Sequence, residues 1–538
     1  MRLSETAAPE LIQTAYTREV ADTAILYAGM SYADLAHMVV LIEAGVAPRA
    51  AGGQLLHALL AIHPEPPLDF ARDPAVGDVY SNREAHLAMH TPYVGYLAAG
   101  RARREAITIA YRRAVRARLL QLAGALIDCA HAAADLAAQH RATLFPDYTY
   151  LQTAQPTSFG HYILTFAYPV LRDLERLRAA YARTNLSPAG SGSVNGSRLP
   201  LDRERLARLL GFEGVIHHTR DAMWQPDGPI EILALLSAAL TNLDRLAEDL
   251  QIFTTQEFRL LELADRHART SKIMPQKKNP YALTYVRGVT GEILGVLAAM
   301  AAIGKTPSGQ PDNRIFAHGG VPRALDQTVG AVRLMAGVLR GLRLDETRAA
   351  ERATAGFAGA TDLAEVIMLA TGIDYRAAHT IVARLASDAL VAAEITPADV
   401  AAAAEAVVGR RLELSTDQLA QALDANRIVA TRTGVGGAAE TAVDVMLAEL
   451  RAALQEHSAW CADCEMRLEQ ANTTLQVEAA ALAIAPRQPP ASPSGTDRPK
   501  TMGDLLRDDD DDAGRPGGKT LGDLLNEPPG WPFGRRDW

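Results

Sequence analysis

Five long runs of alanine- and leucine-rich sequence constrain the fold of this chain most strongly. They cover residues 103–140, 159–184, 230–262, 281–303 and 322–342, and each is close to or beyond ~20 residues, whereas an average helix has about 11–12. Strand signals are almost absent. Hydrophobic residues make up 48% of the chain but aromatic residues only 5%, which favours helices packed through small side chains. We therefore expect an all-α subunit built around an elongated central bundle of long helices.

The sequence around these runs predicts a division into four parts. Residues 1–102 read as a domain of short helices and turns, residues 103–345 as the central bundle, and residues 346–485 as a C-terminal domain of shorter helices. The composition changes after about residue 485. A proline-rich stretch and five consecutive aspartates predict a disordered tail over residues 486–538.

The predicted tail contains a near-exact repeat. KTMGDLL at 500–506 returns as KTLGDLL at 519–525. One interpretation is a docking peptide presented twice, which gains affinity for a partner through avidity; the other is drift after a duplication. The repeat loosely resembles the cargo-loading tags that carry enzymes into encapsulin shells, so a protein shell is one candidate partner.

Charge and cysteine content argue against several classes of protein. The net charge of −9 disfavours a nucleic-acid or anionic-membrane partner. No stretch reaches the ~20 uninterrupted apolar residues of a membrane span, and Glu5 and Glu10 stand where a signal peptide would be basic or apolar. Three cysteines are too few for a disulfide framework, and the lone pair Cys461 and Cys464 indicates two thiols more than a zinc site. We expect a soluble, cytoplasmic protein without metal or cofactor.

One segment between two of the long runs has a different chemistry. TSKIMPQKKNP at 270–280 carries two prolines, two adjacent lysines, an asparagine and a serine. The lysines and the asparagine amide suit a bound carboxylate, and the prolines reduce the entropy that the loop loses on closing. Ser271 can act as a base only if nearby cations and amides stabilise its alkoxide. The alternative is a solvated basic loop between helices.

This segment resembles the signature of the argininosuccinate lyase/fumarase/aspartase superfamily, Gly-Ser-Ser-x-Met-Pro-x-Lys-x-Asn-Pro, and argininosuccinate lyase in particular. The resemblance extends over about residues 20–450, with further similar blocks at 148–177, 189–212, 360–382 and 431–440. It implies a three-domain helical subunit, a homotetramer with composite active sites from three subunits, and elimination of an amine from a succinyl carbon with release of fumarate. The stretch GSGSVNG at 190–196 has the wrong context and spacing for a nucleotide-binding loop.

The resemblance assigns roles to individual residues. Ser271 matches the catalytic base of the family, and Lys277 and Asn279 match the pair that holds the succinyl carboxylates and the aci-carboxylate intermediate. In the second block, Thr149 and Gln155 match substrate-contacting positions. The remaining matches are Arg103 in the first block and Glu231 at a helix start.

Other positions depart from the family pattern. Lys272 replaces the second serine of the signature, Arg104 replaces the asparagine of Ser-Arg-Asn in the first block, and Tyr150 replaces the histidine that supports proton transfer to the leaving group. Gln225 and Pro226 stand where the family has Asp-Arg. Residues 306–320 keep almost none of the Tyr-Asn-Lys-Asp-x-Gln-Glu-Asp-Lys side chains that grip arginine. Candidates for the missing histidine are His161, His217 and His218.

Three interpretations follow. The first is a carbon–nitrogen lyase that handles a succinyl-type substrate with a different amine, where Lys272 and Arg104 could meet an additional acidic group. The second is argininosuccinate lyase proper. The third is a catalytically inactive scaffold with the same fold, although a scaffold has no physical need for a cationic serine loop.

Overall fold

The protein is described by a computed structural model that covers residues 5–307, 312–387 and 395–485. The chain separates into two units, residues 1–485 and 486–538. The predicted tail with its KTxGDLL repeats lies outside the described residues.

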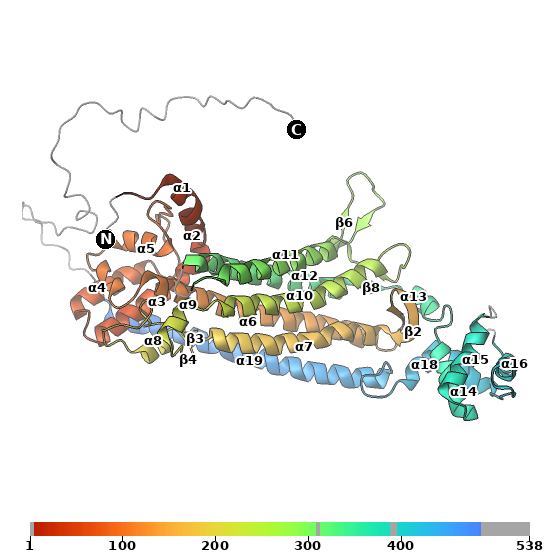
Figure 1. The fold of residues 1–538 in the computed structure, drawn as a ribbon. Coiled ribbons are helices and arrows are strands. Elements are labelled where there is room, and N and C mark those ends of the chain that lie inside the picture. Colours follow the sequence, from red (N-terminus) through yellow and green to blue (C-terminus); the bar gives the residue numbers. More distant parts are fainter. Residues whose placement is uncertain (1–4, 308–311, 388–394, 486–538) are drawn as a thin grey trace, which may run out of the picture. The chain divides into compact units, whose positions relative to one another are not determined.

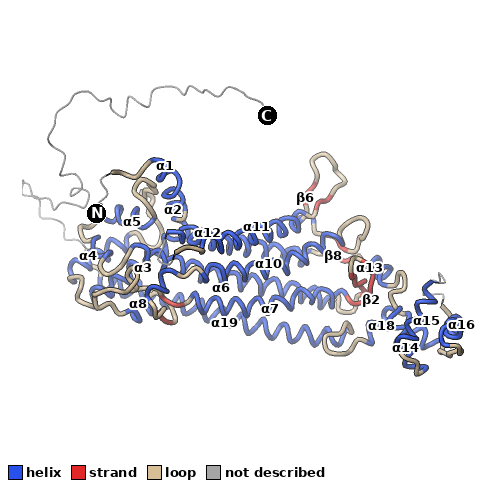
Figure 2. The backbone as a smooth tube through the Cα atoms, in the orientation of Figure 1, coloured by secondary structure: helices blue, strands red, loops and turns tan. Residues whose placement is uncertain are grey.

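Six long helices run side by side in the first unit (Figures 1 and 2). They are α6 (Arg103–Gln139), α7 (Phe159–Thr184), α10 (Asp227–Phe253), α11 (Tyr281–Gly304), α12 (Ile315–Gly341) and α19 (Glu440–Leu482). Helix α6 packs against α7, α12 and α19, and α10 packs against α7, α11 and α12. The predicted all-α fold with a long-helix bundle is confirmed.

Shorter elements flank the bundle. Before α6 lie α1 (Pro9–Leu11), η1 (Ile12–Tyr16), α2 (Thr17–Ala21), α3 (Thr23–Glu43), α4 (Arg49–Ala61), α5 (Val79–Ala88) and η2 (Val94–Ala98). Between the long helices lie α8 (Arg203–Leu209), α9 (Thr219–Trp224), η3 (Asp265–His267) and η4 (Asp312–Arg314). After α12 come α13 (Glu346–Ala353), α14 (Ala360–Thr371), α15 (Tyr375–Ser387), α16 (Pro397–Val408), α17 (Thr416–Leu423) and α18 (Ala425–Thr431).

The strands form four two-stranded pairs and no layer of their own in the described residues. They are β1 (Leu144–Thr149) with β2 (Gln152–Ser158), β3 (Leu186–Ser187) with β4 (Gly214–Val215), β5 (Leu261–Glu262) with β8 (Arg343–Leu344), and β6 (Arg269–Thr270) with β7 (Lys278–Asn279). The β1–β2 hairpin was not predicted, because its two internal prolines argue against a strand. The register shifts between Pro146 and Tyr148, which accommodates the first of them.

Small residues let the long helices approach closely. A side chain at Gly29 of α3 would place its Cβ 2.6 Å from the Cα atom of Ala110 on α6, so glycine is required at this crossing. Buried alanines recur along α6, among them Ala123, Ala130 and Ala134. These contacts bear out the expectation that small side chains carry the packing.

The predicted helix boundaries need four corrections. Helix α10 ends at Phe253 instead of residue 262, because the hydroxyls of Thr254 and Thr255 donate to carbonyls of the last turn. Helix α12 begins at Ile315, so Pro322 lies inside the helix, where its packing offsets the roughly 3 kcal/mol cost of proline. Helix α3 has 21 residues in a region predicted to hold short helices. Helix α19 has 43 residues and lies within residues 346–485, where only shorter helices were predicted.

Helix α19 also joins parts of the chain that the sequence analysis assigned to different domains. Val443 and Leu450 belong to the core of the bundle, while Leu475 and Ala479 belong to the hydrophobic cluster of α3, α4 and α8. Helices α14 to α17 have a buried cluster of their own. The division into domains 1–102, 103–345 and 346–485 stays a prediction.

Among the residues that the structure describes, three helices are long and apolar enough to cross a membrane by length and composition alone: α3, α6 and α11. In each of these helices the apolar stretch has 18 residues. Within the protein, 78% of this stretch is buried in α3 and 72% in α6, but only 28% is buried in α11. Helix α11 therefore presents an apolar surface that the subunit itself does not cover.

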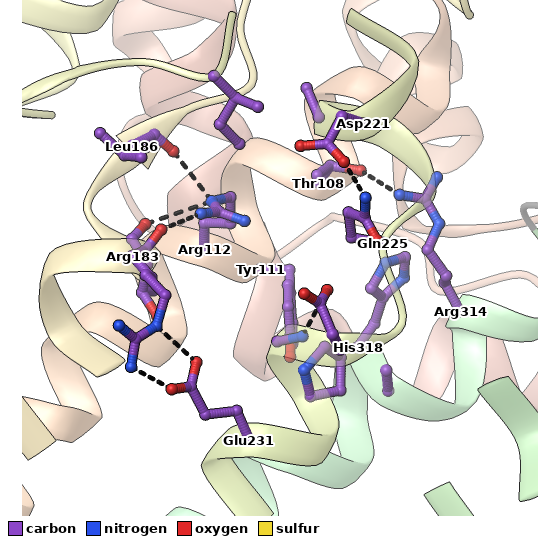
Figure 3. A pocket seen from close by; sticks show the side chains of 17 residues that line it. Thr108, Tyr111, Arg112, Arg183, Leu186, Asp221, Gln225, Glu231, Arg314 and His318 are labelled. Carbon is purple, nitrogen blue, oxygen red and sulfur yellow. Dashed lines mark hydrogen bonds and ion pairs between the residues drawn. The ribbon is translucent and has the colours of Figure 1, made fainter. Parts of the chain in front are cut away.

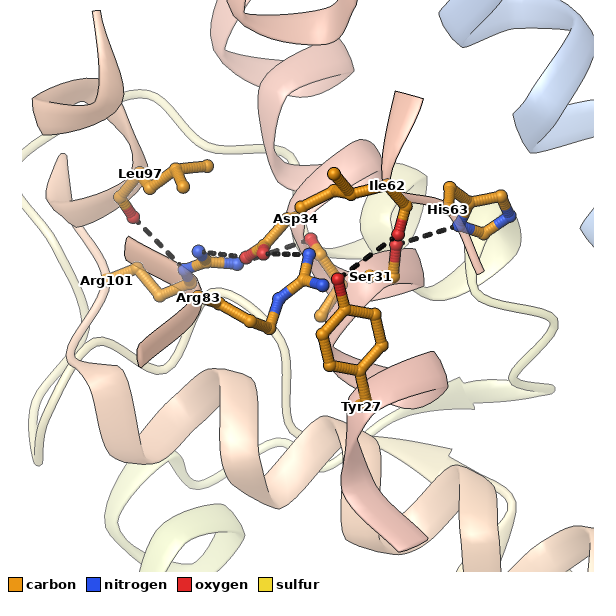
Figure 4. A network of polar contacts seen from close by, with 9 residues as sticks. Tyr27, Ser31, Asp34, Ile62, His63, Arg83, Leu97 and Arg101 are labelled. Carbon is orange, nitrogen blue, oxygen red and sulfur yellow. Dashed lines mark hydrogen bonds and ion pairs between the residues drawn. The ribbon is translucent and has the colours of Figure 1, made fainter. Parts of the chain in front are cut away.

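A buried charge network fixes α5 and the start of α6 to α3 (Figure 4). The carboxylate of Asp34 accepts hydrogen bonds from Arg83 at 3.0 Å and from Arg101 at 2.6 Å, and all three side chains are about 1% exposed. The Arg83 guanidinium also lies 4.3 Å from the ring centre of Tyr27. This network fixes the position of Arg101, which precedes Arg103 by two residues in the sequence.

Candidate active site

The signature segment forms a hairpin that leaves the bundle between α10 and α11 (Figures 1 and 2). Strands β6 and β7 pair Arg269 with Asn279 and Thr270 with Lys278. The loop between them is exposed, with Ile273 at 85% exposure. Ser271 and Asn279 are half-buried at its base. The hairpin thus brings together three of the predicted site residues, Ser271, Lys277 and Asn279.

Backbone amides surround the hydroxyl of Ser271. Its Oγ accepts hydrogen bonds from the N–H of Met274 at 3.1 Å and of Ile273 at 3.4 Å. Its own N–H donates to the carbonyl oxygen of Lys277 at 3.4 Å. Amide donors directed at an oxygen stabilise negative charge on it, which is the requirement for a serine that acts as a base.

The two adjacent lysines of the loop have different surroundings. Lys278 Nζ lies 2.7 Å from Asp265 and 2.8 Å from Glu262. The bonds to Asp265 and Glu262 raise the pKa of Lys278, and Lys278 lowers the pKa of Asp265. Lys277 and Lys272 are exposed and make no ion pair with any residue that the structure describes. The charge of Lys278 is thus compensated within the subunit, whereas that of Lys277 is available to a ligand.

The second predicted block forms the β1–β2 hairpin. Thr149 pairs with Gln152, and Tyr150 and Leu151 make the turn, with φ angles of 54° and 59°. This left-handed conformation is strained for residues other than glycine, and such strain concentrates at functional sites. The Tyr150 side chain is 100% exposed, and Gln155 is exposed on β2. Within one subunit these side chains therefore meet no other predicted site residue.

The first block lies at the opposite end of α6. Arg103 opens the helix, and its guanidinium is 3.4 Å from the buried carboxylate of Asp78. Arg104 pairs with Glu19 at 3.1 Å, and both side chains are 12% exposed. Burial raises the pKa of Glu19, and the charge of Arg104 opposes that shift. Because Glu19 already compensates Arg104, the expectation that this arginine meets an acidic group on the substrate loses support.

The length of α6 separates the blocks within one subunit. Its 37 residues span about 55 Å, with Arg103 at the start and Thr149 beyond the end. The loop with Ser271 leaves the bundle separately from the β1–β2 hairpin (Figure 1). A single subunit therefore presents these blocks at different places on its surface.

Two of the three candidate histidines have structural contacts. The ring of His161 lies 3.0 Å from the Thr157 hydroxyl and 3.1 Å from the carbonyl oxygen of Gly436. His218 caps α9 by accepting from the N–H of Asp221 at 3.2 Å. His217 is exposed. Both ring nitrogens of His161 are engaged, so it is a poor replacement for a catalytic histidine.

A cavity of about 220 Å³ lies close to the first block, between α6, α7, α9, α10 and α12 (Figure 3). The side chains that line it include Thr108, Tyr111, Arg112, Asp221, Asp227, Glu231, Arg314 and His318. Glu231, one of the family positions, forms an ion pair with Arg183 in its wall. Most of these residues were not identified from the sequence. The spacing of Thr108, Tyr111 and Arg112 places them on one helix face, but their partners come from distant segments.

No group of three or more His, Cys, Asp or Glu side chains in the described part of the chain could hold a metal ion. Cys461 and Cys464 are buried free thiols in the interior of α19. Burial raises the pKa of both thiols, which keeps them protonated and unreactive.

Comparison with known proteins decides the family. The profile of a family described as Lyase matches residues 76–295. Argininosuccinate lyase from Methanothermobacter thermautotrophicus is 32% identical over 431 residues, which cover 78% of this chain and 92% of that protein. The enzyme of the same name from Methanoculleus marisnigri is 34% identical over 455 residues, covering 83% and 91%. This chain belongs to the argininosuccinate lyase family.

Solved structures of related proteins agree with this assignment. EDDS lyase in complex with formate matches with a TM-score of 0.80 and 29% identity, over 89% of this chain and 96% of that one. A variant of EDDS lyase with bound fumarate matches equally well. A class II fumarase from Schistosoma mansoni matches with a TM-score of 0.64 at 11% identity, over 80% and 96% of the two chains, which shows the shared fold alone. As a member of the argininosuccinate lyase family, the chain is a carbon–nitrogen lyase.

Proposed function

We propose that this lyase eliminates an amine other than arginine from a succinyl-type substrate, an N-substituted aspartate, and releases fumarate. The observation that carries the proposal is a contrast between two segments. The hairpin at 270–280 keeps Ser271, Lys277 and Asn279 of the family signature, whereas residues 306–320 lack almost all side chains with which the family grips arginine. The fumarate bound to the EDDS lyase variant supports the succinyl side of the proposal.

The proposed mechanism starts at Ser271. Its hydroxyl oxygen, deprotonated in the closed site, removes the proton from the carbon next to a substrate carboxylate. The electron pair moves into that carboxylate and forms an aci-carboxylate, whose added negative charge Lys277 and Asn279 stabilise. The carbon–nitrogen bond then breaks, the double bond of fumarate forms, and the amine leaves with a proton from an acid.

The family pattern does not supply that acid here, because this chain lacks the family histidine. Tyr150 stands in place of the family histidine at the tip of the β1–β2 hairpin, where its side chain is fully exposed. A phenol can donate a proton to a departing amine, so Tyr150 can take the place of the histidine. Thr149 and Gln155 on the same hairpin are proposed to contact the substrate, as is Arg103.

We further propose a homotetramer that assembles each site from three subunits. The three blocks are presented separately by one subunit, and α11 has an exposed apolar face. Along this face, Gly288, Gly291 and Gly295 have open space where a side chain would stand, and Leu294 is 47% exposed. An uncovered apolar helix rich in small residues fits a close contact with identical helices of other subunits. A cytoplasmic location and a partner for the tail repeats remain proposals as well.

A panel of N-substituted aspartates tests the proposed function. The ultraviolet absorbance of fumarate reports turnover, and argininosuccinate is included in the panel. We expect at least one member with another amine to be turned over faster than argininosuccinate. Fastest turnover of argininosuccinate would instead identify the chain as argininosuccinate lyase proper, and absence of fumarate from every member would support a scaffold.

A further inference from the structure

A second cleft lies where α19 passes α8 (Figure 1). It is lined by the end of α7, helix α8, residues 211–213 and the second half of α19, and its volume is about 520 Å³. It shares no lining residue with the cavity at the first block, and no predicted site residue in the described part of the chain lines it. The cleft is therefore separate from the residues assigned to the lyase site.

Three arginines dominate the charge of this cleft. Arg205 and Arg208 come from α8 and Arg467 from α19, whereas Glu213 is the one acidic residue of the lining in the part of the chain that the structure describes. Glu213 lies 3.3 Å from Arg467. Arg208 lies 4.0 Å from Asp202, at the limit of an ion pair, and its side chain is 62% exposed. The lining thus carries an excess of two positive charges, and the charge of Arg208 is available to a ligand.

Ion pairs with acids outside the lining hold the other two arginines in place. Arg205 pairs with Glu43 at 2.9 Å and with Glu478, and Arg467 pairs with Asp463 of its own helix. None of these three carboxylates lines the cleft. A guanidinium has five N–H donors, so these bonds orient both arginines beside the cleft and leave donors for a ligand.

Two buried arginines of α6 stand directly behind the wall of the cleft. Arg116 is 2% exposed, and its Nη1 donates to Oδ1 of Asn185 and to the carbonyl oxygen of Gly211, both at 2.7 Å. Asn185 and Gly211 both line the cleft. Arg113 donates to the carbonyl oxygen of Leu210 at 2.7 Å. The wall between α7 and α8 is therefore held by guanidinium groups from the interior.

The charges of these two buried arginines lack a carboxylate partner. Their hydrogen bonds to described residues go to carbonyl and amide oxygens, and Nε of Arg116 has no partner among the described residues. Burial lowers the pKa of Arg116 to about 9, and the charge of Arg113 adds to this shift. A buried charge without a counter-charge is costly, so an anion in the cleft would reduce the cost.

Guanidinium groups from two facing helices suit a phosphate better than a carboxylate. A phosphate presents oxygens in several directions, and arginine binds two of them at once through parallel N–H donors. A carboxylate has only two oxygens, in one plane. The excess of two positive charges in the lining also matches a phosphate monoester, which carries about −1.5 to −2 charges at pH 7.

We propose that this cleft binds a small phosphate monoester through the three arginines of its lining, beyond the proposed lyase function. The phosphate lies between α8 and α19, and the rest of the ligand lies along the uncharged side chains of Gln470 and Thr474. The volume of about 520 Å³ corresponds to roughly 17 water molecules at about 30 Å³ each, which leaves room for a sugar or glycerol moiety.

Calorimetry on the full-length protein at constant ionic strength tests the site. Ribose 5-phosphate and glycerol 3-phosphate are titrated up to about 10 mM, and inorganic phosphate and citrate are the comparison anions. We expect saturable binding of at least one ester, and at least a tenfold weaker affinity for inorganic phosphate and for citrate. Absence of binding by both esters, or equal binding of inorganic phosphate or citrate, overturns the proposal.

Two substitutions with matched controls locate the binding. Arg208→Gln should weaken binding of the tighter ester at least tenfold, whereas Arg410→Gln, which removes an exposed arginine outside the cleft, should not. Thr474→Glu adds a negative charge to the lining and should abolish binding. Its control is Thr473→Glu at the neighbouring exposed position, which does not line the cleft. Unchanged affinity in both Arg208→Gln and Thr474→Glu would overturn the proposal.

A further variant separates this site from the catalytic hairpin, whose lysines could also attract an anion. Lys277→Met removes an exposed cation of the hairpin and should leave the affinity for the ester unchanged. Loss of binding in Lys277→Met would place the ester at the hairpin and overturn the proposal. Because the readout is binding and not fumarate release, its result is independent of the proposed lyase activity.

Discussion

The hydroxyl oxygen of Ser271 accepts a hydrogen bond from the backbone N–H of Met274 at 3.1 Å. The bond turns the hydroxyl into the loop and aims an amide dipole at the atom that must carry negative charge. It forms within four consecutive residues, so the arrangement depends on the loop itself and not on its contacts with the bundle. Substitutions in and around this loop therefore test its chemistry separately from the stability of the fold.

The two adjacent lysines of the loop should contribute unequally to catalysis. Lys278 is compensated by Glu262 and Asp265, whereas Lys277 is exposed without an ion pair among the described residues. We expect Lys277→Met to lower kcat/KM for the best substrate at least ~100-fold, a loss typical of a removed charge stabiliser. Lys278→Met should lower it only a few-fold. Steady-state kinetics on both variants provide the measurement, and equal losses would contradict this distinction.

The exposed face of α11 should determine the oligomeric state. A side chain at Gly291 meets no atom of the same subunit, so Gly291→Arg should leave the subunit folded but place a charge in the proposed subunit interface. We expect sedimentation velocity to show a tetramer for the unmodified protein and smaller species for this variant. The control is Gly95→Arg, which also has open space but lies in η2. A tetrameric Gly291→Arg protein would be the contrary result.

Glu105 should give the folded protein a distinct pH dependence. Burial raises the pKa of Glu105 to about 7, opposed by hydrogen bonds from the N–H groups of Gly190 and Gly192. Between its ordinary pKa and about 7, the folded state binds a proton that the unfolded state has released, so this group lowers stability as the pH rises. Glu105→Gln removes this titration.

The comparison is made by denaturant unfolding at fixed protein concentration. Relative to the unmodified protein, the variant should gain on the order of 2 kcal/mol between pH 5 and pH 8. A difference in the free energy of unfolding that does not change with pH would show that Glu105 titrates normally.

The network around Asp34 should be essential for stability. Asp34→Asn leaves Arg83 and Arg101 buried without a charged partner, and the expected loss is about 3–5 kcal/mol in the free energy of unfolding. Asp326→Asn removes a partner of Arg118 at a largely exposed position and should cost less than about 1 kcal/mol. Denaturant unfolding of both variants is the measurement. Similar losses in the free energy of unfolding of the two variants would contradict the prediction that the network around Asp34 is essential.

The long helices could be predicted because apolar periodicity over 20 or more residues is a strong signal. Helices α6, α7 and α11 lie within one residue of their predicted bounds. The end of α10 and the start of α12 could not be placed, because side-chain bonds of Thr254 and the packing of Pro322 decide them. The β1–β2 hairpin was hidden by prolines that a register shift accommodates.

The candidate site could be predicted from the sequence only where its residues lie in one short segment. The signature placed Ser271, Lys277 and Asn279 in one loop, and the structure brings them together in one hairpin. The cavity with Tyr111 was not predictable, because its lining comes from five helices whose mutual positions no local pattern specifies. For the same reason, the sequence alone did not reveal that Glu19 compensates Arg104.

The central claim is that Ser271 is the base of a fumarate-releasing elimination. The direct test is the rate of fumarate release by Ser271→Ala, measured with the best substrate of the panel and compared with Thr270→Ala, which removes the neighbouring hydroxyl. Our account predicts a loss of roughly 10³-fold or more for Ser271→Ala, with unchanged oligomeric state and unfolding midpoint, and nearly full activity for Thr270→Ala. Retention of more than about a tenth of the activity by Ser271→Ala would contradict it.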